Sequence, residues 1–177
     1  MITKRTTEDT LVVSIYDEAI IRLMDSKPQR VRKYIATRNL SDIGVGKDGR
    51  IEESADVATI FKVKPLPQKM VQLIDGARDS SIHHRMIFKA CVSDVKNAGD
   101  IIIERDDEDK TLSDDTIDSL GTDIVKDIAL YCIEQREGKN GSTVPFSSRD
   151  GWQTHASRLL AFVAASASTE TKSASEE

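Results

Sequence analysis

The chain has 177 residues and a formal net charge of −5; 38% of its residues are apolar and 31% are charged. This length suits one domain, or one domain with a tail. The acidic balance gives no electrostatic reason to expect nucleic-acid binding, and no apolar run approaches the roughly 20 residues that a membrane-spanning helix needs.

Residues 10–24, TLVVSIYDEAIIRLM, form the first apolar segment of the chain. Val12 and Val13 favour a strand, whereas Tyr16 and Ile20 lie at helical spacing. Because the run is too long for a typical strand, we predict a helix here. A segment this apolar needs to be buried, either in the domain or against a partner.

A second helix is predicted to begin near Pro28, because proline suits the first turn of a helix. One side of this helix is apolar, and the other side is basic, with Arg30, Arg32, Lys33 and Arg38. We interpret the basic side as a solvated helix face, with a binding patch for an acidic partner as the alternative.

Residues 39–57 have the composition of a loop, with a turn or short hairpin predicted around Lys47-Asp48-Gly49. The sequence GVGKDG in this loop lacks the GxxxxGK[ST] spacing of a phosphate-binding loop, and no clear strand precedes it. Nucleotide binding is therefore not predicted.

The chain is expected to be organised around residues 56–97. Alternation with period two over Ala58–Leu66 predicts a half-buried strand, and the prolines at its end terminate it. Helical spacing follows from Met70 to Ala77, and the serines at 80–81 are suited to cap a second helix. In that second helix the spacing i, i+3, i+4, i+7 gives one apolar stripe, formed by Phe88, Cys91, Val92 and Val95.

The histidines and cysteines form no recognisable catalytic or metal-binding pattern. His83 and His84 are adjacent, and neighbours on a helix point about 100° apart, so they cannot readily chelate one metal ion. Cys91 and Cys132 lie on predicted apolar helix faces, which indicates two buried thiols; a disulfide or a reactive thiol is the alternative. His155 has no catalytic partner in any motif. We therefore predict no catalytic residue, no metal ion, no cofactor and no enzymatic activity.

An acidic segment follows a short strand that is predicted at residues 100–104. Between Asp100 and Asp118 there are nine acids and only two bases. A calcium loop would need a central glycine, and none is near; paired carboxylates for sugar hydrolysis would need aromatic walls, which this segment lacks. We predict a solvated loop, with a docking surface for a basic partner as the alternative.

Helices and a tail are predicted for the rest of the chain. Ser113 and Thr122 are suited to begin two helices, and the second of these has the clearest apolar face in the chain and ends at Gly138. A last amphipathic helix is predicted at about residues 148–165. Residues 166–177 are small and polar without periodicity, which predicts disorder.

Together these elements predict a mainly α fold of the α+β class, a small helical domain with one short β-hairpin or sheet and a disordered C-terminal tail. The predicted division is a helical or α+β domain over residues 1–140, a C-terminal amphipathic helix over 141–165 and a disordered tail over 166–177.

The order of these parts resembles that of the tail assembly chaperones of long-tailed bacteriophages. The resemblance covers roughly residues 33–137 and rests on five segments: the lead-in KYIATRNLSDIGVGKDGR (Lys33–Arg50), the strand and turn FKVKPLP (Phe61–Pro67), KACVSDVKN (Lys89–Asn97), the acidic loop and the helix Leu112–Glu137. The sequence departs from the family pattern after Asp94, where Val95 stands in place of a common tryptophan. The helix predicted at 148–165 has no counterpart in the family.

The resemblance implies a non-enzymatic protein of the host cytoplasm, which binds the tape measure protein and recruits tail-tube subunits. Amphipathic helices with more apolar surface than a small core requires would cover the apolar stripes of such a partner, and the acidic run would steer basic subunits. The residues expected to bind the partner lie in the two most apolar helical segments: Val13, Tyr16, Ile20, Trp152, Leu159, Leu160 and Val163.

Neither nucleic acid nor a membrane is expected as a partner, and homo-oligomer formation stays open. The alternative function is that of a permanent virion structural protein, such as a tail or head–tail connector component. A small enzyme and a helix-turn-helix regulator have less support, because no motif brings polar residues together in a pocket and the chain is acidic overall.

Overall fold

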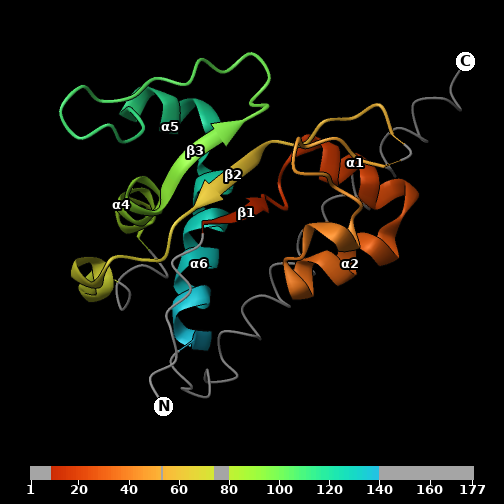
Figure 1. Ribbon diagram of the computed structural model, residues 1–177, viewed down its shortest axis with the longest axis horizontal. Coiled ribbons are helices and arrows are strands. Elements are labelled where there is room, and N and C mark those ends of the chain that lie inside the picture. The colour runs from red at the N-terminus through yellow and green to blue at the C-terminus, as the bar shows by residue number, and fades with distance from the viewer. Residues whose placement is uncertain (1–8, 53, 74–79, 140–177) are drawn as a thin grey trace, which may run out of the picture. The chain divides into compact units, whose positions relative to one another are not determined.

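The computed structural model describes residues 9–52, 54–73 and 80–139 (Figure 1). The chain forms two units, Met1–Lys139 and Asn140–Glu177, and the second unit, with the predicted last helix and tail, lies outside the described residues. The described part confirms the predicted α+β class. Its elements in chain order are β1 (Thr10–Val13), α1 (Glu18–Ser26), α2 (Pro28–Thr37), the 3-10 helix η1 (Leu40–Asp42), β2 (Ile60–Val63), the 3-10 helix η2 (Gln68–Leu73), α4 (Ser81–Cys91), β3 (Val92–Lys96), α5 (Asp114–Leu120) and α6 (Thr122–Lys139).

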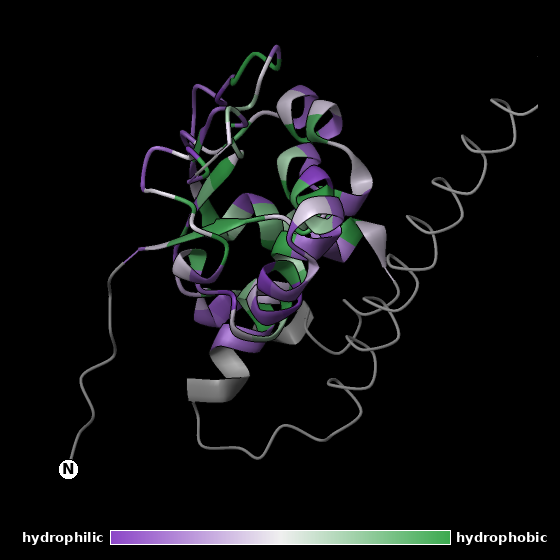
Figure 2. Ribbon diagram, turned by 90° about the vertical axis from the view of Figure 1, so that its right-hand side faces the viewer, coloured by the Kyte–Doolittle hydropathy of each residue, from purple (hydrophilic) through white to green (hydrophobic). Residues whose placement is uncertain are grey.

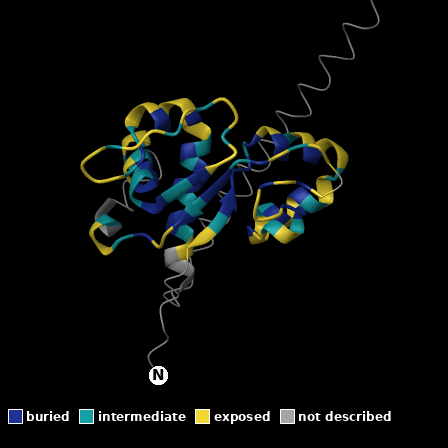
Figure 3. Ribbon diagram, turned by 45° about the horizontal axis from the view of Figure 1, so that its top comes forward, coloured by how far each residue is buried: buried dark blue, intermediate teal, exposed yellow. Residues whose placement is uncertain are grey.

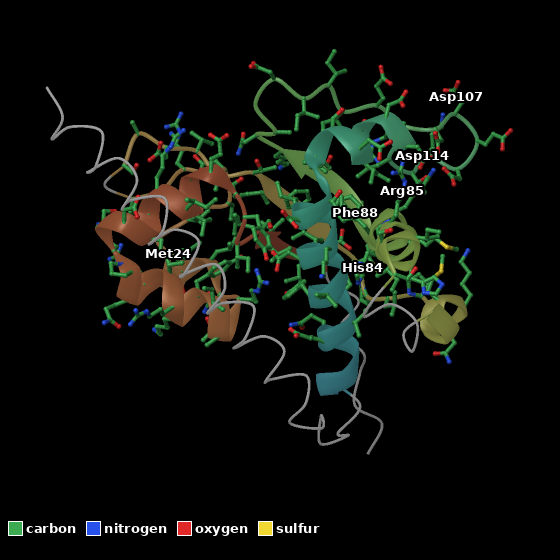
Figure 4. All side chains as sticks on the ribbon, turned by 180° about the vertical axis from the view of Figure 1, so that it is seen from behind. Met24, His84, Arg85, Phe88, Asp107 and Asp114 are labelled. Carbon is green, nitrogen blue, oxygen red and sulfur yellow. The ribbon has the colours of Figure 1, made fainter. Side chains whose placement is uncertain are left out.

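The sheet is antiparallel with the strand order β1-β2-β3. Val12, Phe61 and Val95 lie opposite one another on the three strands and are all buried. Helix α6 crosses this face of the sheet and α4 packs against α6, as Figure 1 and the view from behind in Figure 4 both show. Phe88 of α4 meets Phe61 edge to face, with the ring centroids 5.9 Å apart. The main core therefore lies between the sheet and the α4–α6 pair.

The other face of β1 and β2 is covered as well. Successive residues of a strand point to opposite faces, and Val13 and Ile60, which are paired across the strands, are both buried. Figure 2 shows hydrophobic residues concentrated on the strands, and Figure 3 shows that the same strands are largely buried. Helices α1 and α2 pack on each other, and η1 contacts β1.

The helix predicted over residues 10–24 is wrong in its first half. The structure has a strand, β1, at the start of this segment, and α1 begins only at Glu18. Asp17 is the N-cap of α1: its Oδ1 accepts a hydrogen bond from the N–H of Ala19, and its Oδ2 accepts one from the N–H of Thr59, each at 2.9 Å. Aspartate is a preferred N-cap because its carboxylate satisfies a free N–H of the first helical turn. The long apolar run is therefore a strand followed by a helix.

The helix that was expected to continue to Val95 ends earlier, and β3 follows α4 without a connecting residue. In the β2–β3 pairing, Val92 lies opposite Val63 and Val95 lies opposite Phe61, which leaves Ser93 as an extra residue. This β-bulge turns two valines that are three residues apart to the same face of the sheet. Both are buried for this reason, so a bulged strand reproduces the spacing of a helix.

The remaining local predictions have mixed outcomes. Helix α2 begins at Pro28 as predicted. The turn around Lys47-Asp48-Gly49 is confirmed, since the N–H of Gly46 donates to the carbonyl of Arg50 at 2.9 Å. The helix predicted from Met70 begins as the 3-10 helix η2, and its continuation over 74–77 lies outside the described residues.

The strand predicted at residues 100–104 is wrong, because this segment is irregular. Its polar backbone groups bond to Thr116 rather than to a neighbouring strand: the N–H of Glu104 donates to Thr116 Oγ1 at 2.8 Å. Ile101 and Ile103 pack against the core, whereas Ile102 is 76% exposed. The three isoleucines therefore alternate between inside and outside without forming a sheet.

A buried ion pair joins α2 to α6. Nη2 of Arg38, at the C-cap of α2, lies 2.5 Å from Oδ1 of Asp127 in α6, and the two side chains are only 5% and 1% exposed. Oδ2 of Asp127 also accepts hydrogen bonds from Ser14 Oγ and from the N–H of Ile15, each at 3.0 Å. The prediction that Arg38 belongs to a solvated basic face is therefore wrong, because this arginine has a buried counter-charge. Lys33, from the same predicted face, pairs at the surface with Asp42.

Two tyrosines enclose the guanidinium of Arg38. Its Cζ lies 5.7 Å from the ring centroid of Tyr34 and 5.9 Å from that of Tyr131, within the range of cation–π attraction. The hydroxyl of Tyr34 donates to the carbonyl of Val13 at 2.6 Å and accepts from its N–H at 3.0 Å. Burial acts to lower the pKa of Arg38, but the charge of Asp127 outweighs it and the pKa is raised. Arg38 therefore stays charged inside the protein.

The substitution Asp127→Asn is expected to lower the free energy of unfolding by about 3–5 kcal/mol, because it leaves the guanidinium of Arg38 buried without a counter-charge. Arg38→Met should cost a similar amount, and the double variant should cost less than the sum of the two. Urea unfolding followed by circular dichroism measures all three. Glu18→Gln, which breaks an exposed pair with Arg22, is the control and should have little effect. If the loss of unfolding free energy in the double variant equals the sum of the losses in the two single variants, the pairing is contradicted.

Gly49→Ala is expected to destabilise the protein by more than Gly99→Ala. Both glycines have a positive φ, +86° and +62°, so a side chain is strained at either position, at a cost of about 1–3 kcal/mol. Only at Gly49 would the new Cβ also lie 2.5 Å from the carbonyl oxygen of Ala58, whereas at Gly99 no atom is within 4 Å. Equal losses in the urea midpoint would show that the close approach at Gly49 has no cost.

Candidate partner-binding surface

The seven residues that the sequence predicts as partner-binding are not brought together in the described structure. Val13 and Ile20 are fully buried, and Tyr16 is half-buried. Because Val13 pairs within the sheet and Ile20 lies on the buried side of α1, both are core residues of the described unit. The other four lie outside the described residues: Trp152, Leu159, Leu160 and Val163.

Large apolar side chains are exposed at four described positions, and two of them are neighbours. Ile82 is 69% exposed and Met86 is 43% exposed; the other two are Val57 and Ile102. Ile82 and Met86 are four residues apart on α4, so their side chains lie on one face of that helix. Among the four described positions, these two are the ones that lie on a helix.

Helix α4 has a buried side and an exposed side. It begins at the N-cap Ser80, whose Oγ accepts a hydrogen bond from the N–H of His83 at 3.3 Å. Its buried side consists of His84, Ile87, Phe88 and Cys91. The positions i, i+3, i+4 and i+7 from Ile82 lie on the opposite side. We call these four residues the α4 outer face: Ile82, Arg85, Met86 and Lys89.

The two basic residues of the α4 outer face hold the acidic segment, residues 100–118, against the helix. Arg85 forms an ion pair with Asp118, and it donates to the backbone carbonyl of Asp114 at 3.0 Å. Lys89 Nζ lies 2.5 Å from Oδ2 of Asp106 and 3.7 Å from Oδ1 of Asp114. Figure 4 shows Arg85 and Asp114 side by side at this contact. The acidic segment therefore bonds to the same helix face that carries the apolar pair.

Hydrogen bonds within the acidic segment close it into a defined loop. The N–H of Asp106 donates to the carbonyl of Thr111 at 2.9 Å, and Arg105 pairs with the fully buried Leu112 in a β-bridge. Nη2 of Arg105 donates to the carbonyl of Ser93 at 2.8 Å, which fastens the loop to β3. The segment is largely exposed, as the predicted solvated loop requires (Figure 3), and its contacts bind it to β3 and α4.

The acidic segment keeps a clear excess of negative charge after these contacts. Nine acids less Arg105 and Lys110 of the segment, and less Arg85 and Lys89 of α4, leave five negative charges. Asp107 and Glu108 are exposed and form no ion pair within the described part of the chain. Figure 4 shows Asp107 on the outer side of the segment.

Cys91 and Cys132 are both free and buried, which confirms the prediction of two buried thiols. The hydrogen bond with Cys91, together with burial, raises the pKa of Cys132. A raised thiol pKa disfavours the thiolate, the form that reacts as a nucleophile or binds a metal. Both thiols lie in the core where α4 packs on α6.

Sequence reasoning missed Ile82 and Met86, although a signal was present. The prediction followed one apolar stripe through Phe88 and Cys91 and took it as the face of the helix. Ile82 and Met86 lie outside that stripe, on the side that also carries Arg85 and Lys89. An apolar pair on the charged side of a helix is the pattern that would have identified them.

Arg85→Gln is expected to make the protein less sensitive to acid. The hydrogen bond from Arg85 lowers the pKa of Asp118, so the stability this contact supplies is fully present above the unfolded-state pKa of about 3.9. That stability is lost as the pH falls through the lower, folded-state pKa. Between about pH 5 and pH 2.5 the thermal midpoint should therefore fall less in Arg85→Gln than in the wild type.

Arg50→Gln is the matched control, because Arg50 pairs with Asp48 at 3.6 Å in a different loop. This control should keep the acid sensitivity of the wild type. An equal fall of the thermal midpoint in Arg85→Gln and the wild type would show that the contact with Asp118 does not contribute.

The described residues contain no cluster of three or more His, Cys, Asp or Glu that could hold a metal ion. Within the same residues, none of the helices has the length and apolar character needed to cross a bilayer. Compared with known proteins, the chain matches no protein-family model, no curated protein and no solved structure.

Proposed function

We propose that this chain is a non-enzymatic assembly chaperone of long bacteriophage tails, which binds the tape measure protein in the host cytoplasm and recruits tail-tube subunits. The proposal starts from the resemblance over residues 33–137. The segments that carry this resemblance are neighbours in one packed unit: β2 pairs with β3, α4 packs on α6, and the acidic segment bonds to α4.

The observation that best supports the proposal is the exposure of Ile82 and Met86 beside a fixed acidic loop. Exposed apolar side chains on one helix face are typical of a site that binds another helix. A tape measure protein is a long helical chain with apolar stripes, and such stripes aggregate unless another protein covers them. The two basic residues of this helix face, Arg85 and Lys89, are already engaged in ion pairs with the acidic loop.

The test is co-expression of the full chain with the tape measure protein of the same phage, followed by measurement of the soluble tape measure yield. We expect the yield to rise severalfold, because the chaperone covers apolar surface. The control is co-expression with the destabilised variant Asp127→Asn, which should protect less. An unchanged yield with the wild-type chain would contradict the proposal.

Mass spectrometry of purified virions distinguishes the chaperone function from the competing one, that of a permanent virion subunit. An assembly chaperone should be absent from mature virions, or present far below one copy per tail. Stoichiometric presence in the particle would favour the structural alternative.

A further inference from the structure

The α4 outer face combines an apolar pair with basic residues that are already neutralised. Ile82 and Met86 are one helical turn apart, about 5–6 Å, which matches the spacing of an apolar stripe on one partner helix. Arg85 and Lys89 share the helix face with this pair. Arg85 forms an ion pair with Asp118, and Lys89 forms one with Asp106. The positive charges of the face are therefore not available to an acidic partner.

The acidic segment adds negative charge beside the α4 outer face. After its own bases and those of α4 are counted, five negative charges remain. Asp107 and Glu108 are the clearest source, since both are exposed and form no ion pair within the described residues. Asp107 and Glu108 directly follow Asp106, the residue at which Lys89 binds the loop to α4.

We propose that the α4 outer face is the docking site for one amphipathic helix with basic flanks, whose apolar stripe covers Ile82 and Met86 and whose Lys or Arg residues face Asp107 and Glu108. The site rests on the proposed function and names the kind of tape measure segment that it would bind. Apolar contact supplies the affinity, and charge complementarity selects the partner, because an acidic helix would meet like charge.

The experiment uses the full chain and two synthetic helical peptides with the same leucine stripe, one with lysine flanks and one with glutamate flanks. Binding is measured by fluorescence anisotropy. The lysine peptide should bind at least about tenfold more tightly than the glutamate peptide, and its affinity should fall as salt is raised. Equal affinities, or no binding of the lysine peptide, would overturn the proposal.

Two pairs of variants locate the site. Ile82→Gln with Met86→Gln should weaken the lysine peptide by about tenfold or more, because two apolar side chains lose their contact. Val57→Gln is the control, since Val57 is 46% exposed and lies away from α4 in the sequence; it should bind as the wild type does. Unchanged binding by the α4 variant would place the site elsewhere.

A second double variant and its matched control test the contribution of the loop charges to peptide binding. Asp107→Asn with Glu108→Gln removes two acids of the loop, and Glu18→Gln with Asp25→Asn removes two exposed acids of the α1 region. The loop variant should bind the lysine peptide several times more weakly and with a smaller salt dependence, whereas the α1 variant should not. Equal effects would mean that only net charge matters and would overturn the assigned position of the basic flank.

The peptide result and the function can fail separately. If the α4 variant loses the lysine peptide but still raises soluble tape measure yield as the wild type does, this site is not the one used for the tape measure protein. If the wild-type chain itself leaves the yield unchanged, the chaperone function fails whatever the peptides do.

Discussion

The ion pair between Arg38 and Asp127 is the contact on which the rest of the described unit depends. It lies where three segments that are distant in the sequence meet, the end of β1, the end of α2 and the middle of α6. Burying two charges costs free energy unless they pair with each other and their remaining hydrogen bonds are made. Here the hydroxyl of Ser14 and the N–H of Ile15 donate further hydrogen bonds to the carboxylate of Asp127. The pair therefore fixes the position of α6, and α6 in turn supports α4 and its outer face.

Local chemistry explains which parts of the fold were predictable. Pro28, Ser80 and Ser113 begin or cap helices as their residue types suggest, because capping depends only on neighbouring residues. The errors arise where tertiary contacts decide. Residues 10–13 are a strand because β2 is there to pair with them. Val92 and Val95 have the spacing of an apolar helix face because a β-bulge changes the period of the strand. The bulge arises from the pairing of β3 with β2.

The candidate site was less predictable than the fold, for a related reason. Periodicity indicates which apolar residues share one face of a helix. It does not indicate whether the rest of the chain buries that face. The apolar run that contains Val13 and Ile20 was expected to be in excess, yet β1 and α1 bury both residues completely. Ile82 and Met86 were passed over because Arg85 and Lys89 share their face. The acidic segment was visible from composition, whereas its attachment to α4 depends on contacts between residues 17 to 33 positions apart.

Helix α4 passes into β3 with no residue between Cys91 and Val92, and this continuity has a mechanical consequence. A flexible linker would let the helix rotate without moving the sheet, but no linker residue lies between α4 and β3. Twisting α4 about its axis would draw Val92 away from Val63 and disturb the middle strand. We therefore expect helix and strand to open as one cooperative element. A force applied to the outer side of α4 would therefore be transmitted directly to the sheet through the junction of Cys91 and Val92.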